Sequence, residues 1–386
     1  MLFPRGEFGQ NDSLSRGRVQ VIRVRDAAAQ AHAVLSEIRR LRERGVPEWS
    51  GIAVLSSTRR DLAQVRALPE RESAPVRWFA GRGAMPPLHQ IREVRKFLKR
   101  LAESRPSLIR ATDLSRLASE MFGDQHQNQW IQFVHQILET WRSESDDAEV
   151  PGPQALEFLY EACAESRRDF SYGEGVVLST VHSAKGAEYD HVLLIGPWPL
   201  KPDRAQQEEE RRAFYVGMTR ARKTLAVFDR LDFRPSLPES LAGPAVLGRE
   251  FTGTTAVSEA SGVDYAVLGL DDIHLGYPGQ FKEGHPIHTA LATLGPGDRL
   301  DIRQQDDRAP GLFDQNGTCI ARLAQKAAAL WAARLDAIRE VRVLALVHRS
   351  PDQDTDQTRR ESYRASAWEV PVVEVVLEER DESLVH

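Results

Sequence analysis

Two runs of the sequence decide the expected fold: VVLSTVHSAKGAEYDHVLLIG at residues 176–196 and EEERRAFYVGMTRARKTLAVF at residues 208–228. In the first run, Val176–Leu178 and His191–Ile195 are short, apolar and rich in β-branched residues. Runs of this length are too short for helices, so they predict two buried strands. The loop between the strands, residues 179–188, is crowded with hydroxyl, imidazole, ammonium and carboxylate groups.

The second run predicts a helix and a third strand. A charged helix from Gln206 to about Ala221 precedes the apolar segment Leu225–Phe228. In open α/β sheets, ligands bind where strands end and helices begin. We therefore expect the loop 179–188 and the end of this helix to carry ligand-binding side chains.

The residues before this region predict further strands and helices of the same sheet. Strands are expected at Val19–Val24, Ile52–Leu55 and Val76–Ala80. Asp26 is expected to cap a first helix, and Thr58 a second one. This alternation predicts an α/β fold, in which a parallel sheet carries helices on both faces.

A short helical insertion is predicted between the two parts of the sheet. Residues 106–142 contain apolar side chains at helical core spacing, namely Trp130, Val134, Ile137, Leu138 and Trp141. We interpret the tryptophans as core residues rather than as platforms for stacked bases. An acidic linker at Ser143–Pro153 and a helix at Gln154–Ser166 are expected to lead back to the sheet.

The helix expected at Ile91–Leu101 has a basic face. Its cations at helical spacing are Arg92, Arg95, Lys96 and Lys99. They could contact phosphates, which is the functional interpretation. They could also form a solvated surface, which is the commoner use of a charge run and the interpretation we favour.

A second module is predicted after a boundary rich in proline and glycine. Strands are expected at Tyr265–Leu268, Arg299–Arg303, Val341–Val347 and Trp368–Leu377, and helices at Ile287–Leu294 and Gln325–Leu335. The Asn316-Gly317 pair predicts a hairpin turn. These short mixed elements indicate a small α+β or barrel-like module.

The composition fits a globular protein of two or three domains in 386 residues. The net charge is 51 − 56 = −5, so any nucleic-acid contact has to be a local patch. Cys163 and Cys319 have no metal-ligand spacing and suggest a reducing compartment. No leader-like segment and no long apolar run is present, which predicts a cytoplasmic protein without membrane contact.

The two central runs resemble motifs V and VI of the UvrD-like (superfamily 1) DNA helicases. Thr180-Val181-His182-Ser183-Ala184-Lys185-Gly186-Ala187-Glu188 resembles motif V. The run Glu209–Ala221, EERRAFYVGMTRA, resembles motif VI. The order and spacing of two long motifs make this resemblance specific. It implies a RecA-like motor domain that works on ATP with Mg²⁺ and on single-stranded or partly duplex DNA.

The resemblance also implies roles for individual residues. Arg220 corresponds to the arginine finger, which neutralises charge on the departing γ-phosphate. The alternative for Arg220 is a surface arginine that pairs with Glu208–Glu210. Gly186 would let the backbone approach the nucleotide, and Glu188 would accept a hydrogen bond from the ribose.

Other implied roles concern DNA and the contact between the motifs. Thr180, His182 and Lys185 match positions that contact the single-strand backbone or couple it to the ATP site. Arg212 is implied to support the contact between motif VI and motif V. We interpret Asp190 and His191 as structural.

Together, pattern and resemblance predict an ordered series of parts. They are a peripheral or disordered segment (1–17), the first part of a RecA-like motor domain (18–105), a short helical insertion (106–152), the second part of the motor domain (153–232), a linker (233–264) and the small module (265–386). The last module resembles the extra C-terminal part of bacterial proteins that join a RecQ-type helicase to a UvrD-like C-terminal half.

Two motifs of a complete motor are missing from the sequence. No Gly-x-x-x-x-Gly-Lys-Ser/Thr loop occurs, and no Asp-Glu pair follows an apolar strand before motif V. Leu268–Asp272 resembles such a strand only superficially, and the family's motif IV arginine is absent as well. We therefore expect the chain alone not to hydrolyse ATP.

Two hypotheses about function follow. The chain is either the C-terminal half of an ATP-dependent DNA helicase, completed in cis or in trans by a P-loop helicase N-terminal half, or a non-enzymatic module that binds single-stranded DNA or regulates another protein.

Overall fold

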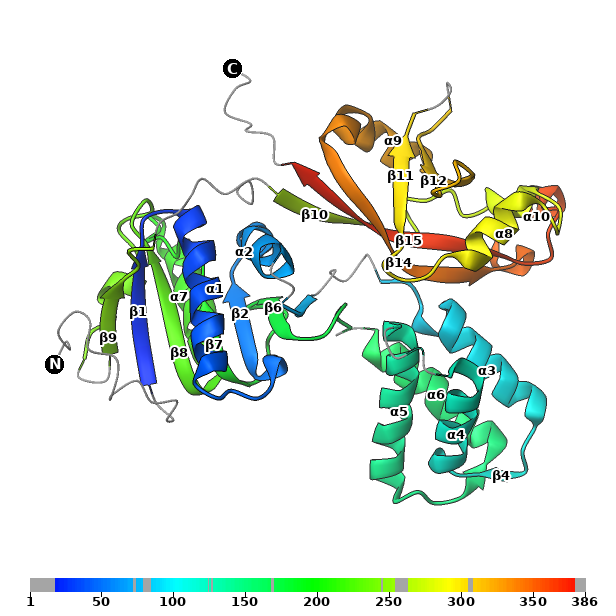
Figure 1. The fold of residues 1–386 in the computed structure, drawn as a ribbon, viewed down its shortest axis with the longest axis horizontal. Coiled ribbons are helices and arrows are strands. Elements are labelled where there is room, and N and C mark those ends of the chain that lie inside the picture. The colour runs from blue at the N-terminus through cyan, green and yellow to red at the C-terminus, as the bar shows by residue number, and fades with distance from the viewer. Residues whose placement is uncertain are drawn as a thin grey trace. The chain divides into compact units, whose positions relative to one another are not determined.

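The computed structural model describes residues 18–71, 74–78, 85–123, 125, 128–167, 170–243, 246–253, 263–304 and 308–378. The segment 1–17, expected to be peripheral or disordered, lies outside these residues. The chain divides into two compact units (Figure 1). Unit 1 comprises residues 1–79, 171–264 and 379–386, and unit 2 comprises residues 80–170 and 265–378. The sequence-based boundaries are drawn differently, because they keep residues 80–105 with the sheet.

Unit 1 contains a seven-stranded sheet in the order β3-β6-β2-β7-β8-β1-β9, and every neighbouring pair is parallel. Its strands are β1 (Arg18–Val24), β2 (Ile52–Ser56), β3 (Val76–Trp78), β6 (Val176–Thr180), β7 (Tyr189–Leu194), β8 (Ala221–Arg230) and β9 (Val246–Glu250). The predicted α/β fold with a parallel sheet is confirmed.

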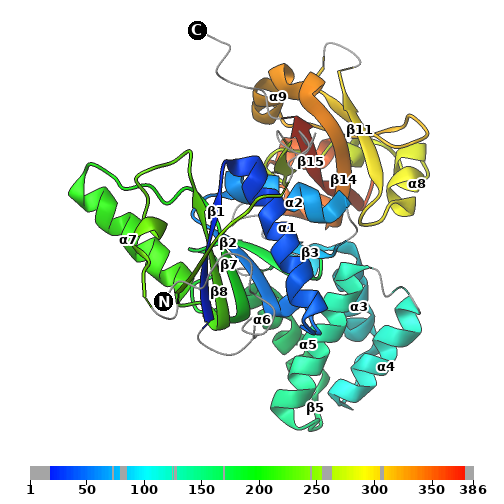
Figure 2. The same ribbon diagram turned by 60° about the vertical axis from the view of Figure 1, so that its left-hand side comes forward.

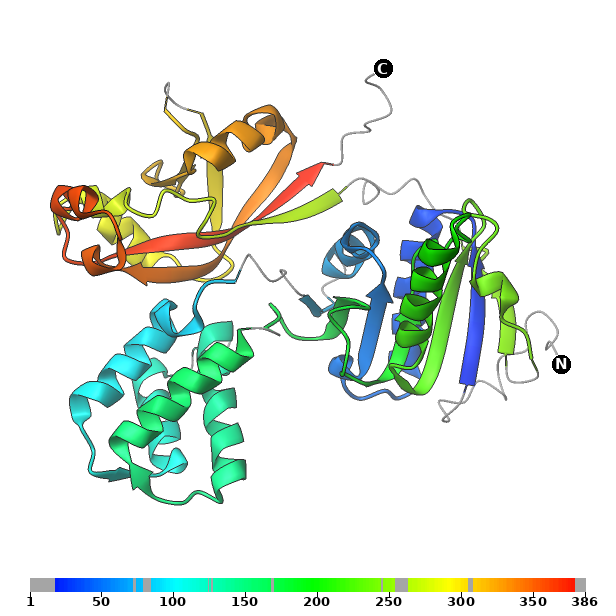
Figure 3. The same cartoon turned by 180° about the vertical axis from the view of Figure 1, so that it is seen from behind.

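Helices lie on both faces of this sheet. Helices α1 (Ala27–Glu43) and α2 (Arg59–Arg71) cover one face, and α7 (Arg204–Met218) covers the other (Figures 1 and 3). The predicted cap of α1 is present, since Asp26 Oδ1 accepts a hydrogen bond from the Ala29 amide at 2.9 Å. Helix α7 buries only Phe214 and Gly217, and its first turns stand away from the sheet (Figure 2).

Strand β9 corrects the interpretation of residues 233–264 as a linker. Val246–Glu250 pairs in parallel with β1 and forms the edge of the sheet. The segment escaped prediction because it has only two apolar residues, Val246 and Leu247, and lies among prolines and glycines. At the edge of the sheet β9 is only partly buried, so few of its side chains have to be apolar.

Unit 2 contains a six-stranded sheet in the order β10-β15-β14-β11-β12-β13. The strands are β10 (Val263–Leu268), β11 (Arg299–Arg303), β12 (Gly311–Phe313), β13 (Cys319–Arg322), β14 (Ile338–Arg349) and β15 (Trp368–Glu378). The helices beside them are α8 (Pro286–Thr293), α9 (Gln325–Trp331) and α10 (Gln357–Ser362). The predicted Asn-Gly hairpin is confirmed, since β12 and β13 are antiparallel and Gly317 has φ +79°.

The other part of unit 2 is a helical insertion that is longer than the predicted one (106–152), because it also includes residues 91–105 and 153–166, which were assigned to the motor domain. Its helices are α3 (Arg92–Ser104), α4 (Ala111–Phe122), α5 (Gln129–Ser145) and α6 (Gly152–Ser166), with the two-residue strands β4 (Leu108–Ile109) and β5 (Val150–Pro151). All five predicted core residues, including Trp130 and Trp141, are buried. The predicted linker at 143–153 is shorter than expected, because helix and strand residues fill both its ends.

These helices pack on the β14–β15 hairpin, within unit 2. Ile91, just before α3, forms an isolated bridge with Val347 of β14. The indole of Trp130 on α5 is fully buried and donates to the Leu344 carbonyl oxygen at 2.8 Å. The opposite face of the hairpin contributes Val343, Leu346 and other residues to a separate apolar core. The hairpin is therefore covered on both faces.

Arg92 is the central polar contact between the two parts of unit 2. Only 7% of its surface is exposed. Its Nε donates to Glu369 Oε1 at 2.7 Å, and Nη2 reaches the second oxygen of that carboxylate. The two Nη groups also donate to the carbonyl oxygens of Leu291 and Leu294, at the end of α8. The expectation that Arg92 belongs to an exposed basic face is wrong.

Replacing Arg92 should destabilise unit 2. Arg92→Met leaves the Glu369 carboxylate and two carbonyl oxygens without their donor, and we expect the free energy of unfolding to fall by about 3 kcal/mol. Urea unfolding, followed by circular dichroism, measures this change. The matched control, Lys96→Met on the exposed side of the same helix, should stay within about 0.5 kcal/mol of the wild type. Equal midpoints for the two variants would contradict the prediction.

Candidate nucleotide and DNA site

The loop that follows β6 lies against one face of the unit 1 sheet. The Val181 amide donates to the Ser56 carbonyl oxygen at 2.8 Å, which continues the pairing of β6 with β2. Val181 and Ala184 are buried in the same apolar core as Leu194. Thr180 Oγ1 accepts from the Ser183 amide at 3.2 Å, and this local bond forms a turn.

The strand register shows that this loop connects the two opposite ends of the parallel strands. We call the side of the sheet where the strands finish the carboxyl edge and the side where they begin the amino edge. Thr180 pairs with Ser56 where both strands end, whereas Tyr189 pairs with Ala221 where both strands begin. At about 3.3 Å per residue, the five residues of β6 separate the two edges by roughly 16 Å. The loop 181–188 therefore returns the chain from the carboxyl edge to the amino edge.

The predicted site residues divide between these edges. Thr180 lies at the carboxyl edge, as expected, and His182 follows it closely. Glu188 lies directly before β7, and Arg220 directly before β8, at the amino edge. The end of the motif VI helix, which was expected to carry ligand-binding side chains, therefore lies at the amino edge. A helix that leads into the next parallel strand has to finish at the amino edge.

Arg220 joins the end of α7 to the motif V loop. Its Nη1 donates to the Ala187 carbonyl oxygen at 3.1 Å, and its Nε donates to the Val216 carbonyl oxygen at 3.1 Å. Its Nη2 donates to Thr219 Oγ1 at 3.2 Å. The alternative pairing of Arg220 with Glu208–Glu210 is absent among the contacts of the described residues. A guanidinium has five N–H donors, so two of them remain for a ligand.

Arg212 does not make the contact that the resemblance implies. Its side chain is exposed, and its Nε donates to Glu208 Oε1 at 3.3 Å, one turn earlier in α7. Such an exposed pair contributes little to stability. Arg220, rather than Arg212, connects motif VI to motif V.

Three of the predicted ligand-binding side chains project from the loop without internal partners. Throughout the described residues, the side chains of His182, Lys185 and Glu188 form no hydrogen bond or ion pair. Gly186, between them, has φ +91°, and a Cβ atom there would have no neighbour within 4 Å. Glycine is required at Gly186 by the backbone conformation, and the space beside it is open.

Asp190 and His191 have internal partners, which agrees with the structural role expected for them. Asp190 accepts from Lys223 at 2.8 Å and lies 3.1 Å from Arg222. The hydrogen bond from Lys223 lowers the pKa of Asp190. His191 is buried, with Nδ1 2.8 Å from Thr224 Oγ1, and burial lowers its pKa.

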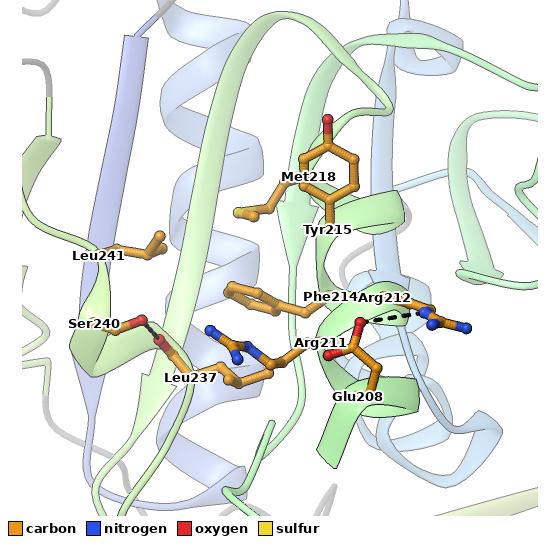
Figure 4. Close-up of a pocket in the computed structure, with 9 residues that line it drawn as sticks. All are labelled: Glu208, Arg211, Arg212, Phe214, Tyr215, Met218, Leu237, Ser240 and Leu241. Carbon is orange, nitrogen blue, oxygen red and sulfur yellow. Dashed lines mark hydrogen bonds and ion pairs between the residues drawn. The ribbon is translucent and has the colours of Figure 1, made fainter. Parts of the chain in front are cut away.

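A groove of about 460 Å³ runs beside α7 (Figure 4). Phe214, Met218, Leu237 and Leu241 supply apolar side chains, and Arg211 reaches toward Leu237. Glu208 and Arg212, which pair with each other, also line the groove (Figure 4). Sequence reasoning missed Leu237 and Leu241, because they lie after motif VI in a Pro-rich segment without periodicity.

Comparison with known proteins supports a helicase relationship for part of the chain. Residues 85–229 match the family model of the UvrD-like helicase C-terminal domain. A 64-residue segment is 44% identical to the ATP-dependent DNA helicase UvrD2 of Mycobacterium tuberculosis, covering 14% of this chain and 9% of that protein. A 151-residue segment is 28% identical to the ATP-dependent DNA helicase PcrA of Leuconostoc citreum, covering 36% of this chain and 20% of that protein.

The chain thus spans about a tenth to a fifth of the length of these curated relatives. A solved structure, the C-terminal domain of a possible DNA helicase from Lactobacillus plantarum, is 10% identical with a TM-score of 0.29. It covers 61% of this chain and 85% of its own, and so low a TM-score supports no conclusion about this protein. Separately, none of the described helices is both long and apolar enough to cross a membrane.

Acidification should destabilise unit 1 through His191. Its pKa is lowered in the folded protein, mainly by burial, so its stabilising effect is complete above the unfolded value of 6.5. As the pH falls below 6.5, the unfolded chain binds the proton first and the free energy of unfolding decreases. Urea unfolding between about pH 7.5 and pH 5.5 should show this loss.

The His191→Gln variant should lose less stability over that pH range. Part of the pH dependence should remain in the variant, because burial also lowers the pKa values of His89 and His348. Identical pH profiles for the variant and the wild type would exclude a contribution from His191.

Proposed function

We propose that this chain is the C-terminal half of an ATP-dependent DNA helicase motor, which supplies Arg220 and the loop 180–188 to an ATP site completed by a P-loop domain. The observation that carries the proposal is the meeting of both motifs at one edge of the sheet, where Arg220 bonds Ala187 beside Glu188. The match of residues 85–229 to the UvrD-like helicase C-terminal domain supports it.

The residues at this edge are chemically suited to a nucleotide. Glu188 has no internal partner among the described residues and can accept a hydrogen bond from a ribose hydroxyl, and the open space beside Gly186 admits a ligand close to the backbone. Arg220 keeps two N–H donors, and its planar fork suits phosphate oxygens. ATP, when bound, supplies the γ-phosphoryl group whose negative charge an arginine finger stabilises.

The Mg²⁺ ion that accompanies ATP is held in sites of this kind by one or two carboxylates together with the phosphates of the nucleotide. No group of three His, Cys, Asp or Glu side chains among the described residues could hold a metal ion. The P-loop domain, which holds the phosphates in motors of this kind, is the proposed source of these ligands.

The opposite edge is suited to the DNA backbone. Thr180, His182 and Lys185 present hydroxyl, imidazole and ammonium groups, which donate well to phosphate oxygens. His182 and Lys185 are exposed. Single-stranded DNA is therefore the proposed ligand at this edge, while ATP is the proposed ligand at the other.

Removing the positive charge of Arg220 should abolish ATP hydrolysis by the completed motor. In a complex with a P-loop helicase half, we expect Arg220→Gln to lower kcat by roughly 10³-fold or more, since the finger no longer neutralises phosphate charge. The glutamine amide nitrogen takes the place of Nε and can still donate to the Val216 carbonyl oxygen, but it does not reach the Ala187 carbonyl oxygen. Steady-state ATPase rates with oligo-dT measure the effect, and fluorescence anisotropy should show DNA affinity unchanged.

Arg212→Gln is the matched control, because it removes a charge from the same helix without touching the loop. It should keep the wild-type rate. If Arg220→Gln and Arg212→Gln hydrolyse ATP equally fast, Arg220 is not the finger. If the isolated wild-type chain hydrolyses ATP, the proposal that the phosphate-binding P-loop lies in another domain is wrong.

The alternative function is a non-enzymatic module that binds single-stranded DNA. It is favoured by the engagement of Arg220 with two carbonyl oxygens and a hydroxyl, which suits a purely structural arginine. This alternative predicts salt-dependent DNA binding that ATP leaves unchanged. A clear change in DNA affinity on addition of ATP and Mg²⁺ would exclude it. The resemblance of residues 265–386 to RecQ-linked proteins stays a prediction.

A further inference from the structure

One side of α3 carries four cations, which we call the α3 basic face: the half-buried Arg95 and the exposed Lys96, Lys99 and Arg100. Lys99 lies 3.7 Å from Glu103, a distant pair between exposed side chains. Among the described residues, Arg95, Lys96 and Arg100 have no ion pair. Four cations on two successive turns repel one another. They form a patch of positive charge in a chain whose net charge is −5.

The direction of the α3 basic face is fixed by the interior contacts of the helix. Arg92 is held by Glu369 and by two carbonyl oxygens of unit 2. Val94, Phe97 and Leu98 are buried on the same helix. The helix cannot rotate without exposing these groups, so Lys96, Lys99 and Arg100 remain directed toward solvent. A fixed set of donors loses less conformational entropy on binding than a mobile one.

Two half-buried imidazoles lie beside the α3 basic face but add no positive charge to it, because their pKa values are lowered. The charge of Arg95 contributes to the lowered pKa of His89, just before α3, and of His348, near the end of β14, although burial is the main cause for both. Both imidazoles are therefore close to Arg95. Lys99 also lies near His348, and the carboxylate of Asp352 lies near Arg95, so this side of the surface carries negative charge as well.

An exposed aromatic side chain lies beside this surface. The Tyr160 ring on α6 is 43% exposed and meets the His89 ring edge-on, with centroids 5.5 Å apart. Its hydroxyl and the solvent-facing side of its ring are available to a planar ligand. Glu157, Glu161 and Glu165 lie along the same helix and limit the positive surface on that side.

We propose that the α3 basic face binds the phosphate backbone of a single nucleic-acid strand, with Tyr160 stacking on one of its bases. Cations along a surface and an exposed aromatic ring are the two elements of single-strand recognition. A duplex would hide its bases from Tyr160, so the exposed ring favours a single strand over a duplex. The proposal goes beyond the motor function, because it involves no residue of motifs V and VI.

Fluorescence anisotropy with labelled oligo-dT of about 20 nucleotides tests the proposal on the full chain without ATP. Arg95→Gln with Lys99→Gln should weaken binding roughly tenfold. The slope of log K against log salt should become shallower by about 0.7 for each phosphate that the variant no longer neutralises. Tyr160→Ala should weaken binding with little change in that slope, since it removes stacking and no charge.

The matched control is Arg116→Gln with Arg142→Gln, which changes the net charge equally and lies in the same helical part of unit 2. Both arginines are already paired, with Asp113 and Glu139 at 2.7 Å, so oligo-dT affinity should stay near the wild-type value. Equal weakening by both double variants would overturn the proposal, since bulk charge would then explain the loss.

Two further results would overturn it. One is tighter binding of a blunt duplex than of oligo-dT with unchanged binding by Tyr160→Ala, which assigns the surface to duplex. The other is unchanged oligo-dT binding in Arg95→Gln with Lys99→Gln while His182→Ala with Lys185→Ala abolishes it. The latter result places DNA at motif V alone, so failure of this proposal remains distinct from failure of the proposed motor function.

Discussion

The buried guanidinium of Arg92 is the constraint on which unit 2 depends. A buried charge is tolerated only when it is paired and hydrogen-bonded, and the partner here, Glu369, is 277 residues away in the sequence. The carbonyl oxygens of Leu291 and Leu294, at the end of α8, complete its hydrogen bonds. The helical insertion and the C-terminal sheet therefore have to fold as one body. Residues 85–229 match the helicase family model, and Arg92 within this segment is bonded to residues that lie after its end, such as Glu369.

Local pattern predicted most elements of both units but not this contact. The 3.6-residue period placed Trp130 and Trp141 in the core, and the Asn316-Gly317 pair specified a hairpin, because each depends on residues nearby in the sequence. The period also grouped Arg92 with the exposed cations of α3. Only the carboxylate of Glu369, which no local window includes, makes a buried arginine favourable there. Strand β9 was missed for a local reason, since Val246 and Leu247 are its only apolar residues.

Motif resemblance located the candidate site, and the sheet determined its geometry. Arg220, Gly186 and Glu188 could be named from sequence, but the division of the site between two edges follows from the strand register. The same register explains why the motif VI helix ends at the amino edge. The sequence pattern does not tell whether Arg212 or Arg220 contacts the motif V loop. The arginine that reaches Ala187 depends on how α7 approaches the sheet.

The bond from Arg220 to Ala187 gives the proposed motor a way to link its two ligands. Loop 181–188 is anchored at the carboxyl edge by the Val181–Ser56 bond and at the amino edge by Arg220. A phosphate that drew the Arg220 guanidinium away from Ala187 would release only the second anchor. The loop would then be free to move beside His182 and Lys185, which face DNA in this proposal. A two-position element that both ligands bias is the physical requirement for coupling between sites. Under the non-enzymatic alternative the hydrogen bond from Arg220 to Ala187 is always formed, and ligand binding at one edge does not affect the other edge.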